Sequence, residues 1–206
     1  MTIQWLGRAC FRLEHDGYSI VIDPYNTSLT GYPPLSVSAD MVLISHDHPG
    51  HNNAAAVKLS GTTRPCPFEI ERVVVGHDEA NGVLRGMNTI HILLCDGLKI
   101  VHLGDVGFAT EDGRLMLPDV LMTGCGSFRT LPSYVMHDMA ENLGANVVIP
   151  MHQHHGRYGN RRICTAEEFA AHFEGERDII EYPTDTIEIT RDMPRQVAIL
   201  RYMERK

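Results

Sequence analysis

The stretch 39-ADMVLISHDHPGH-51 joins a short apolar strand to three closely spaced histidines. Its Pro-Gly pair is incompatible with a regular helix, so we expect the histidines to lie on a loop at the end of the strand. In an extended segment His46 and His48 point to the same side, and a turn at the Pro-Gly pair can bring His51 beside them. Three converging imidazoles favour a site for a metal ion such as Zn²⁺ over a surface loop that is rich in histidine by chance.

Two parts of the chain share one plan, in which a β-hairpin is followed by a further strand. Asp-Gly pairs at 16–17 and 96–97 separate apolar runs, the pattern of a tight hairpin. The flanking runs are 10–13 with 18–22, and 89–94 with 98–103. The strand 39–45 resembles 118–124, and the offsets from the hairpins are 24 positions (16 to 40) and 23 (96 to 119). This order indicates an internal duplication within a single domain, 1–206, with β-rich halves at roughly 1–80 and 81–206 that pack as one unit.

Helices are expected at two places in the second half. One covers 133–143, between Pro132 and Gly144, and the other covers 165–173, where Thr165 and Glu168 form a capping box. Further strands are expected at 146–150, 186–189 and 197–202. Two β-sheets flanked by helices predict a layered domain of the α/β (α+β) class.

Composition narrows the classes of partner. The 206 residues carry a formal net charge of −8, which argues against nucleic acid as a partner. No apolar run is long enough to span a membrane, and polar residues interrupt the N-terminal segment where a signal peptide needs an apolar stretch. Five scattered cysteines without a CxxC pair suit a reducing compartment. We therefore expect a cytoplasmic protein that acts on a small molecule and binds neither membrane nor nucleic acid, while its oligomeric state stays open.

Three further polar residues each end an apolar run. His77 follows 73–76, Asp105 follows 100–104 and His152 follows 147–151. Alone, each is more typical of a turn or a cap. Together with the histidine loop they predict one cleft, because loops at strand ends converge in layered folds.

These motifs resemble the metallo-β-lactamase superfamily, and more closely its ascorbate-6-phosphate-lactonase-like branch of small metal-dependent hydrolases. The resemblance covers nearly the whole chain up to about Gly156. It is carried by HxHxxH at 46–51, then His77, LGD at 103–105 and PMH at 150–152, together with WLG at 5–7, DP at 23–24, RGMNT at 85–89 and HLGD at 102–105. It implies a four-layer αββα sandwich with a metal cleft at one edge.

The resemblance also implies the roles of the site residues. One ion would bind His46, His48 and His77, and a second would bind His51 and His152, with Asp105 bridging the two. The ions would be divalent, with zinc favoured and manganese or iron as alternatives. They would activate water for hydrolysis, in which Asp105 and His51 are the expected catalytic residues.

Gly50 departs from the pattern of this superfamily, which has aspartate before the third histidine of the loop. That aspartate normally binds the second ion, and Asp47 is expected to point away from the site. Three consequences are open. The protein is a mononuclear enzyme, it has a weak second site completed by another ligand, or it binds metal without catalysis. The candidate replacement ligands are Asp78, His154 and His155, although Asp78 is better explained as a carboxylate that holds a neighbouring imidazole.

The expected activity is hydrolysis of an ester, lactone or phosphoester bond in a small anionic metabolite. Two alternatives stay open, a metal-binding protein with little or no hydrolysis because of Gly50, and an iron-dependent redox enzyme on the same scaffold. The loop 124–130 could face the cleft and bring Arg129 to an anionic substrate, although a solvated arginine is the commoner case. Arg157, Arg161 and Arg162 are expected on a solvated face.

Overall fold

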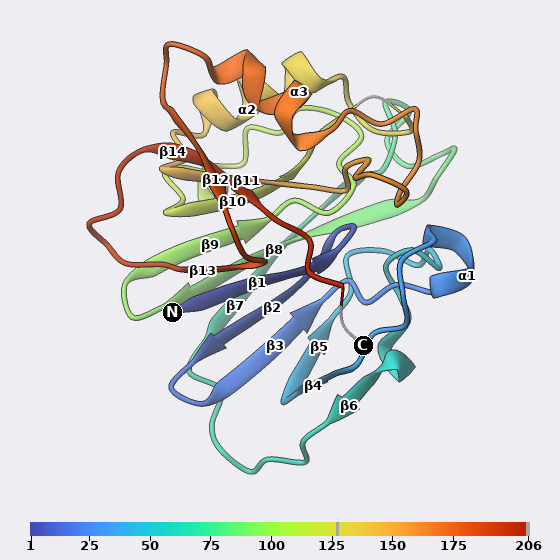
Figure 1. Ribbon diagram of the computed structural model, residues 1–206, viewed down its shortest axis with the longest axis vertical. Helices are drawn as coiled ribbons and strands as arrows, with labels where there is room; N and C mark the ends of the chain where they lie inside the picture. Colours follow the sequence, from blue (N-terminus) through green and yellow to red (C-terminus); the bar gives the residue numbers. More distant parts are fainter. Residues whose placement is uncertain (127, 205–206) are drawn as a thin grey trace.

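Within residues 1–126 and 128–204, which the computed structural model describes, two main β-sheets face each other and helices cover one outer side (Figure 1). The smaller sheet has the order β13 (Thr186–Glu188), β1 (Thr2–Gly7), β2 (Cys10–His15), β3 (Tyr18–Ile22) and β5 (Met41–Leu43). The larger sheet has the order β12 (Asp178–Tyr182), β14 (Gln196–Leu200), β11 (Val147–Met151), β10 (Val120–Gly124), β9 (Leu98–His102), β8 (Met87–Cys95) and β7 (Glu69–Gly76). A small separate sheet pairs β4 (Val37–Ala39) with β6 (Val57–Leu59). The predicted α+β class is confirmed.

Both predicted hairpins, and the strand after each, are confirmed. Strands β2 and β3 pair antiparallel, and β5 then lies parallel to β3. Strands β8 and β9 repeat this arrangement, with β10 parallel to β9. Asp16 and Asp96 at the hairpin turns have φ of +49° and +50°, the left-handed backbone that these tight turns need. The expected boundary near residue 80 does not separate the sheets, however, because β7 joins the larger sheet and β13 joins the smaller one.

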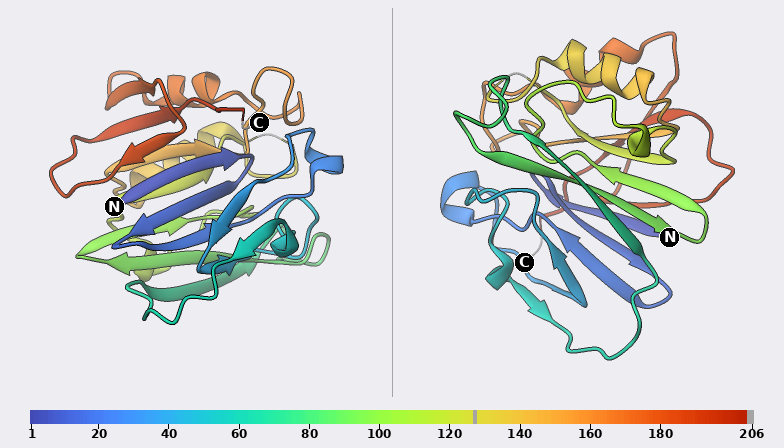
Figure 2. Two further views of the ribbon diagram at one scale, coloured as in Figure 1. Left: turned by 60° about the horizontal axis from the view of Figure 1, so that its bottom comes forward. Right: turned by 180° about the vertical axis from the view of Figure 1, so that it is seen from behind.

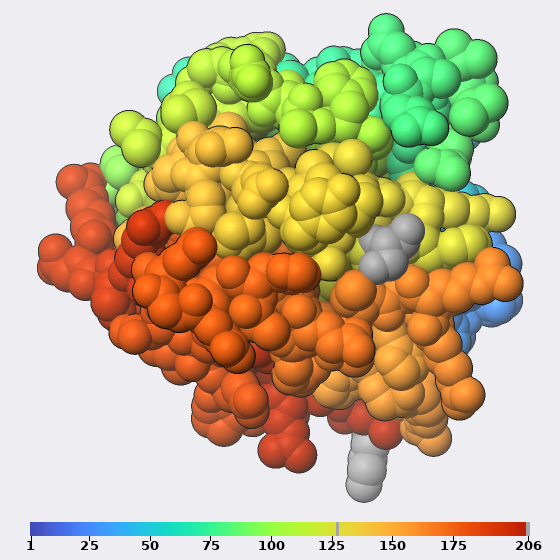
Figure 3. Space-filling view, turned by 90° about the horizontal axis from the view of Figure 1, so that it is seen from above, coloured from blue at the N-terminus to red at the C-terminus, as the bar shows by residue number. Residues whose placement is uncertain are grey.

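Helices α2 (Ser133–Asn142) and α3 (Ala166–Ala170) cover the outer face of the larger sheet, which Figure 3 views from above. A 3₁₀ turn, Ala171–Phe173, extends α3, and the predicted capping box is present between Thr165 and Glu168. A further 3₁₀ turn, Gly113–Leu115, belongs to the helix side of the larger sheet, where Leu115 joins the core beneath α2 and α3. Beside the smaller sheet, the described residues contribute only the four-residue α1 (Thr27–Thr30) and the 3₁₀ turn Ala54–Ala56. The fourth layer of the expected sandwich is therefore thin, as the views in Figure 2 show.

Apolar cores lie on both faces of the larger sheet. Val120 and Met122 of β10 face the core between the sheets, while Leu121 faces the helices. Because successive side chains of a strand point to opposite faces, a strand covered on both sides is apolar throughout. This explains the unbroken apolar runs before several of the predicted site residues.

The predicted site residues lie where strands end. Strands β9, β10 and β11 are parallel neighbours, so their carboxyl ends meet at one edge of the larger sheet. Strands β3 and β5 are parallel in the smaller sheet. Loops from both sheets gather at this edge, on the right of Figure 1. None of the described helices has the length and apolar character needed to cross a membrane.

The contribution of α3 packing to stability can be tested by substitution. Phe169 is fully buried and meets Phe173 edge-on, with ring centroids 5.3 Å apart. We expect Phe169→Ala to lower the free energy of unfolding by about 3–5 kcal/mol, because it leaves a cavity beneath the helices. Urea denaturation measures this cost. Tyr134→Ala, at a side chain on α2 that is 58% exposed, is the control and should change stability by about 0.5 kcal/mol or less. Equal costs for the two variants would contradict this packing.

Candidate metal centre

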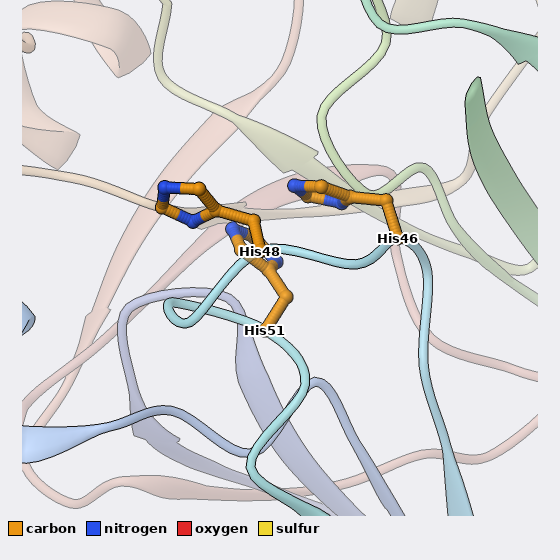
Figure 4. Close-up of side chains that lie close together, drawn as sticks. All are labelled: His46, His48 and His51. Carbon is orange, nitrogen blue, oxygen red and sulfur yellow. The ribbon is translucent and has the colours of Figure 1, made fainter. Parts of the chain in front are cut away.

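All six predicted metal ligands gather at the edge where the strands end. The loop after β5 carries His46, His48 and His51, whose rings lie close together in Figure 4. The other three follow β7, β9 and β11, and are His77, Asp105 and His152. The cluster thus draws residues from the ends of strands in both sheets.

Asp105 lies among the imidazoles. Its Oδ2 is within 4.0 Å of Nε2 of four rings, at 3.3 Å from His51, 3.5 Å from His152, 3.7 Å from His77 and 4.0 Å from His46. Possible ligand atoms within 4.8 Å of one another form four groups among the described residues. Three lie in this cluster, namely His46–His77–Asp105, His51–Asp105–His152 and His46–His48–His51, and the fourth, His137–Glu141–Glu176, lies outside it. Asp105 belongs to the groups His46–His77–Asp105 and His51–Asp105–His152, so its carboxylate is shared by two possible ligand sets.

A carboxylate behind the histidines orients two of the rings. Asp23, fully buried, accepts hydrogen bonds from the Ser45 amide at 2.7 Å, the Ser45 hydroxyl at 2.6 Å and Nδ1 of His51 at 2.8 Å. Because the Ser45 hydroxyl donates to Asp23, it accepts from Nδ1 of His46, 2.9 Å away. Both rings therefore turn Nε2 toward Asp105. The sequence gives one signal for Asp23, since it ends an apolar run as the other site residues do, but no role was assigned to it or to Ser45.

Burial and neighbouring charges shift the pKa values of the histidines in opposite directions. Burial lowers the pKa of His46 to about 3, with a further contribution from His51, and burial also lowers the pKa of His152 to about 3. These rings are neutral at physiological pH. Burial alone would lower the pKa of His51 too, but Asp105 and Asp23 on its two sides raise it to about 9. A cation that binds at Nε2 of His51 must therefore displace a proton.

Several polar atoms of the cluster fit a bound cation. Nε2 of His46, Nε2 of His152 and Oδ1 of Asp105 are buried, and each lacks a hydrogen-bond partner in the part of the chain that the structure describes. Buried polar atoms without partners are costly, whereas neutral imidazoles and a carboxylate are typical ligands of zinc and related ions. The donor set therefore fits a divalent metal ion.

His48 is less well placed than the other histidines. Its ring centroid is 5.9 Å from that of His46, and the Gly50 amide donates to its Nδ1 at 3.1 Å. A neutral ring that accepts at Nδ1 carries its proton on Nε2. Ligation through Nε2 would require the other tautomer and the loss of this hydrogen bond.

Asn88 holds Asp105 in position, a role that the sequence motif did not reveal. This fully buried side chain accepts from the Asp105 amide at 3.0 Å and donates to the Leu103 carbonyl at 2.8 Å. Gly104 between them has φ of +59°, and a Cβ there would lie 2.3 Å from the Asn88 amide oxygen. Glycine is thus required both for the backbone conformation and for the space.

None of the three proposed replacement ligands belongs to a ligand group that includes Asp105 among the described residues. Asp78 instead accepts four backbone N–H groups at 2.7–3.1 Å, from Ala80, Gly82, Leu84 and Arg85. It therefore shapes the loop that follows His77. His155 packs against Trp5 with ring centroids 6.1 Å apart, and His154 lies outside the cleft lining. Asp47 is exposed, accepts a hydrogen bond from Asn52 and lines the cleft, but it belongs to no ligand group among the described residues.

A cleft of about 790 Å³, a size typical of sites for small molecules, is lined by five residues of this cluster, namely His46, His48, His77, Asp105 and His152. Three arginines line it, namely Arg8, Arg85 and Arg129. Phe128 forms part of the wall and lies against the guanidinium groups of Arg129 and Arg162, 5.2 and 5.1 Å from its ring centroid. The predicted loop 124–130 therefore does face the cleft, although its Ser127 lies outside the described residues.

Residues 2–152 match the family model of the beta-lactamase superfamily domain, and the chain belongs to this superfamily. A structure from Thermotoga maritima, of a protein of the metallo-beta-lactamase superfamily, is similar over 98% of this chain and 99% of that chain. The TM-score is 0.74 and the sequence identity is 26%.

Archaeal relatives carry a functional name. A protein of Hyperthermus butylicus, named UPF0173 metal-dependent hydrolase, is 27% identical over 73% of this chain and 82% of its own length. A protein of Archaeoglobus fulgidus with the same name is 27% identical over 74% of this chain and 83% of its own length. The resemblance drawn from the motifs is therefore confirmed at the level of the superfamily.

The hydrogen bonds of Asp23 lead to a test. In Asp23→Asn, one amide oxygen replaces two carboxylate oxygens and the negative charge is lost, so Ser45 and His51 are held less firmly. We expect zinc affinity to fall by about 10–100-fold, measured by competition with a chromogenic chelator. Asp112→Asn, at a carboxylate that pairs with Arg114, is the matched control and should leave affinity unchanged. Unchanged affinity in Asp23→Asn would contradict the orienting role.

The buried neutral histidines also make stability depend on pH. Burial lowers the pKa of His46 and His152 to about 3 and that of His91 to about 4. In the unfolded chain these rings take up protons near pH 6.5, so between about pH 6.5 and about pH 4 the unfolded state binds more protons. Stability of the chelator-treated protein should therefore fall with acidification through this window, as followed by urea denaturation. A constant or rising stability would contradict the neutral state of these rings.

Proposed function

We propose that this protein is a metal-dependent hydrolase that cleaves an ester, lactone or phosphoester bond in a small anionic metabolite. The observation that carries the proposal is the Asp105 carboxylate, with four imidazole Nε2 atoms within 4.0 Å, in an arginine-lined cleft. The names of the archaeal relatives support hydrolysis as the reaction type.

The residues divide between holding the metal and holding the substrate. His46, His77 and Asp105 would hold a divalent ion, with zinc the best match to imidazole and carboxylate ligands and manganese or iron as alternatives. Such an ion lowers the pKa of coordinated water and polarises the bond to be cleaved. Arg85 and Arg129 line the cleft, where their guanidinium groups can pair with carboxylate or phosphate groups of a substrate.

Two alternative functions differ from this proposal in the metal that binds or in whether a substrate is hydrolysed. Metal binding without hydrolysis and iron-dependent redox chemistry both fit the same scaffold, because a fold does not determine a reaction. Elemental analysis combined with an esterase assay separates them. Zinc or manganese with activity supports the proposal, metal without activity supports a binding protein, and iron with visible colour supports redox chemistry.

A small molecule is the partner that this proposal requires. The net charge of −8 disfavours nucleic acid. Cys66, Cys95 and Cys125 are free thiols, which suits the reducing cytoplasm as the compartment.

Hydrolysis should depend on both the metal and the carboxylate. The experiment uses a panel of chromogenic lactones, esters and phosphodiesters, each in an anionic and a neutral form. Chelation should abolish turnover, zinc should restore it, and Asp105→Asn should reduce it by about 100-fold or more. Glu71→Gln, on β7 away from the cleft, serves as the control. Turnover that survives both chelation and Asp105→Asn would contradict the proposed function.

A further inference from the structure

Arg8 lies in the turn between β1 and β2 and reaches into the metal cluster. Its carbonyl accepts hydrogen bonds from the Trp5 indole at 2.8 Å and the His152 amide at 2.9 Å, which fix the backbone at a φ of +53°. Its side chain lines the cleft, and its Nη2 lies 3.5 Å from Nε2 of His51. One side of the site is thus built around a guanidinium group.

Gly50 provides the space that this guanidinium group fills. A Cβ at residue 50 would lie 2.5 Å from Nη2, 2.6 Å from Nε and 2.7 Å from Cζ of Arg8, closer than real Cβ contacts allow. Gly50 is not among the residues with positive φ, so the backbone conformation does not require glycine here. A larger residue at position 50 would have to displace the end of the Arg8 side chain. Glycine instead of aspartate at position 50 therefore goes together with the position of the Arg8 side chain.

Arg8 also places a positive charge on the His51 side of the cluster. The group His51–Asp105–His152 contains a single carboxylate, shared with the group on the other side. A second ion bound to Nε2 of His51 would lie about 2.0–2.1 Å from that nitrogen, beside a guanidinium group that is already near it. The carboxylates of Asp105 and Asp23 are the acidic groups near Arg8, whose pKa burial lowers. A guanidinium group keeps its charge in proteins because its ordinary pKa lies far above neutral pH.

We propose that the guanidinium group of Arg8 takes the place of a second metal ion, so that the centre binds one divalent ion on the side of His46, His77 and Asp105. The inference rests on the proposed metal centre, but it concerns the number of ions and not the reaction. Because Arg8 faces the cleft, its guanidinium group can bind the negative charge that develops on a substrate oxygen during hydrolysis.

Metal stoichiometry tests this proposal without any assay of activity. The protein is dialysed against zinc, washed and analysed for zinc per chain. We expect one tightly bound ion in the wild type and at most one in Gly50→Asp, where the new carboxylate meets the Arg8 guanidinium. We expect two in the double variant Arg8→Gly/Gly50→Asp, since glycine tolerates the positive φ of residue 8 and the aspartate then faces an open site.

The matched control is the double variant Arg85→Gln/Gly50→Asp. It removes a different arginine from the cleft but leaves Arg8 against residue 50, so it should bind no more than one ion. Two tightly bound ions in the wild type, or a single ion in a folded Arg8→Gly/Gly50→Asp variant, would overturn the inference and leave the proposed function intact. No bound ion in the wild type would instead overturn the metal centre itself.

Cobalt titration of the wild type keeps the inference testable if the variants do not fold. Cobalt(II) reports its ligands through visible absorbance, which should saturate at one equivalent and disappear in His46→Ala. A second equivalent with its own absorbance change and comparable affinity would overturn the inference.

Discussion

Asp23 lies fully buried behind the histidine loop, and the orientation of the proposed metal centre depends on its carboxylate. It holds His51 directly and His46 through the Ser45 hydroxyl, so both rings turn Nε2 toward Asp105. Burial alone would raise the pKa of Asp23, but His51 and Ser45 lower it to about 2, so the carboxylate stays ionised. Metal sites generally need such partners, because a ligand that can rotate binds less tightly than one fixed in advance.

The fold brings the remaining residues to this carboxylate. The smaller sheet contributes Asp23 and the histidine loop, whereas the larger sheet contributes the ends of β7, β9 and β11. The centre therefore forms only when the two sheets pack, and metal binding should be coupled to that packing. Arg8 enters from a third direction, the turn after β1, and its guanidinium group fills the space beside Gly50. Arg8 thereby places a guanidinium group on the His51 side of Asp105, opposite the proposed site for the ion.

Local patterns in the sequence predicted much of the fold and site. The Asp-Gly hairpins, the capping box at Thr165 and the polar residues after apolar runs are short-range signals, and each is present in the structure. The contact of Arg8 with Gly50 joins positions 42 residues apart (8 to 50), so no local pattern could reveal it. Gly50 does not have a positive φ, and its close neighbour is the Arg8 side chain from the turn between β1 and β2. The role of Ser45 likewise depends on a hydroxyl that relays a hydrogen bond across the loop.

We propose that Asp105 and the surrounding imidazoles bind one divalent ion, with Arg8 as the second cation. Anomalous diffraction at the zinc absorption edge, from crystals grown with excess zinc, tests this claim most directly. We expect one anomalous peak in the cluster, about 2.0–2.2 Å from ligand atoms of His46, His77 and Asp105, with the Arg8 guanidinium group ordered against Gly50. Two peaks on opposite sides of Asp105, or no peak in the cluster, would contradict it.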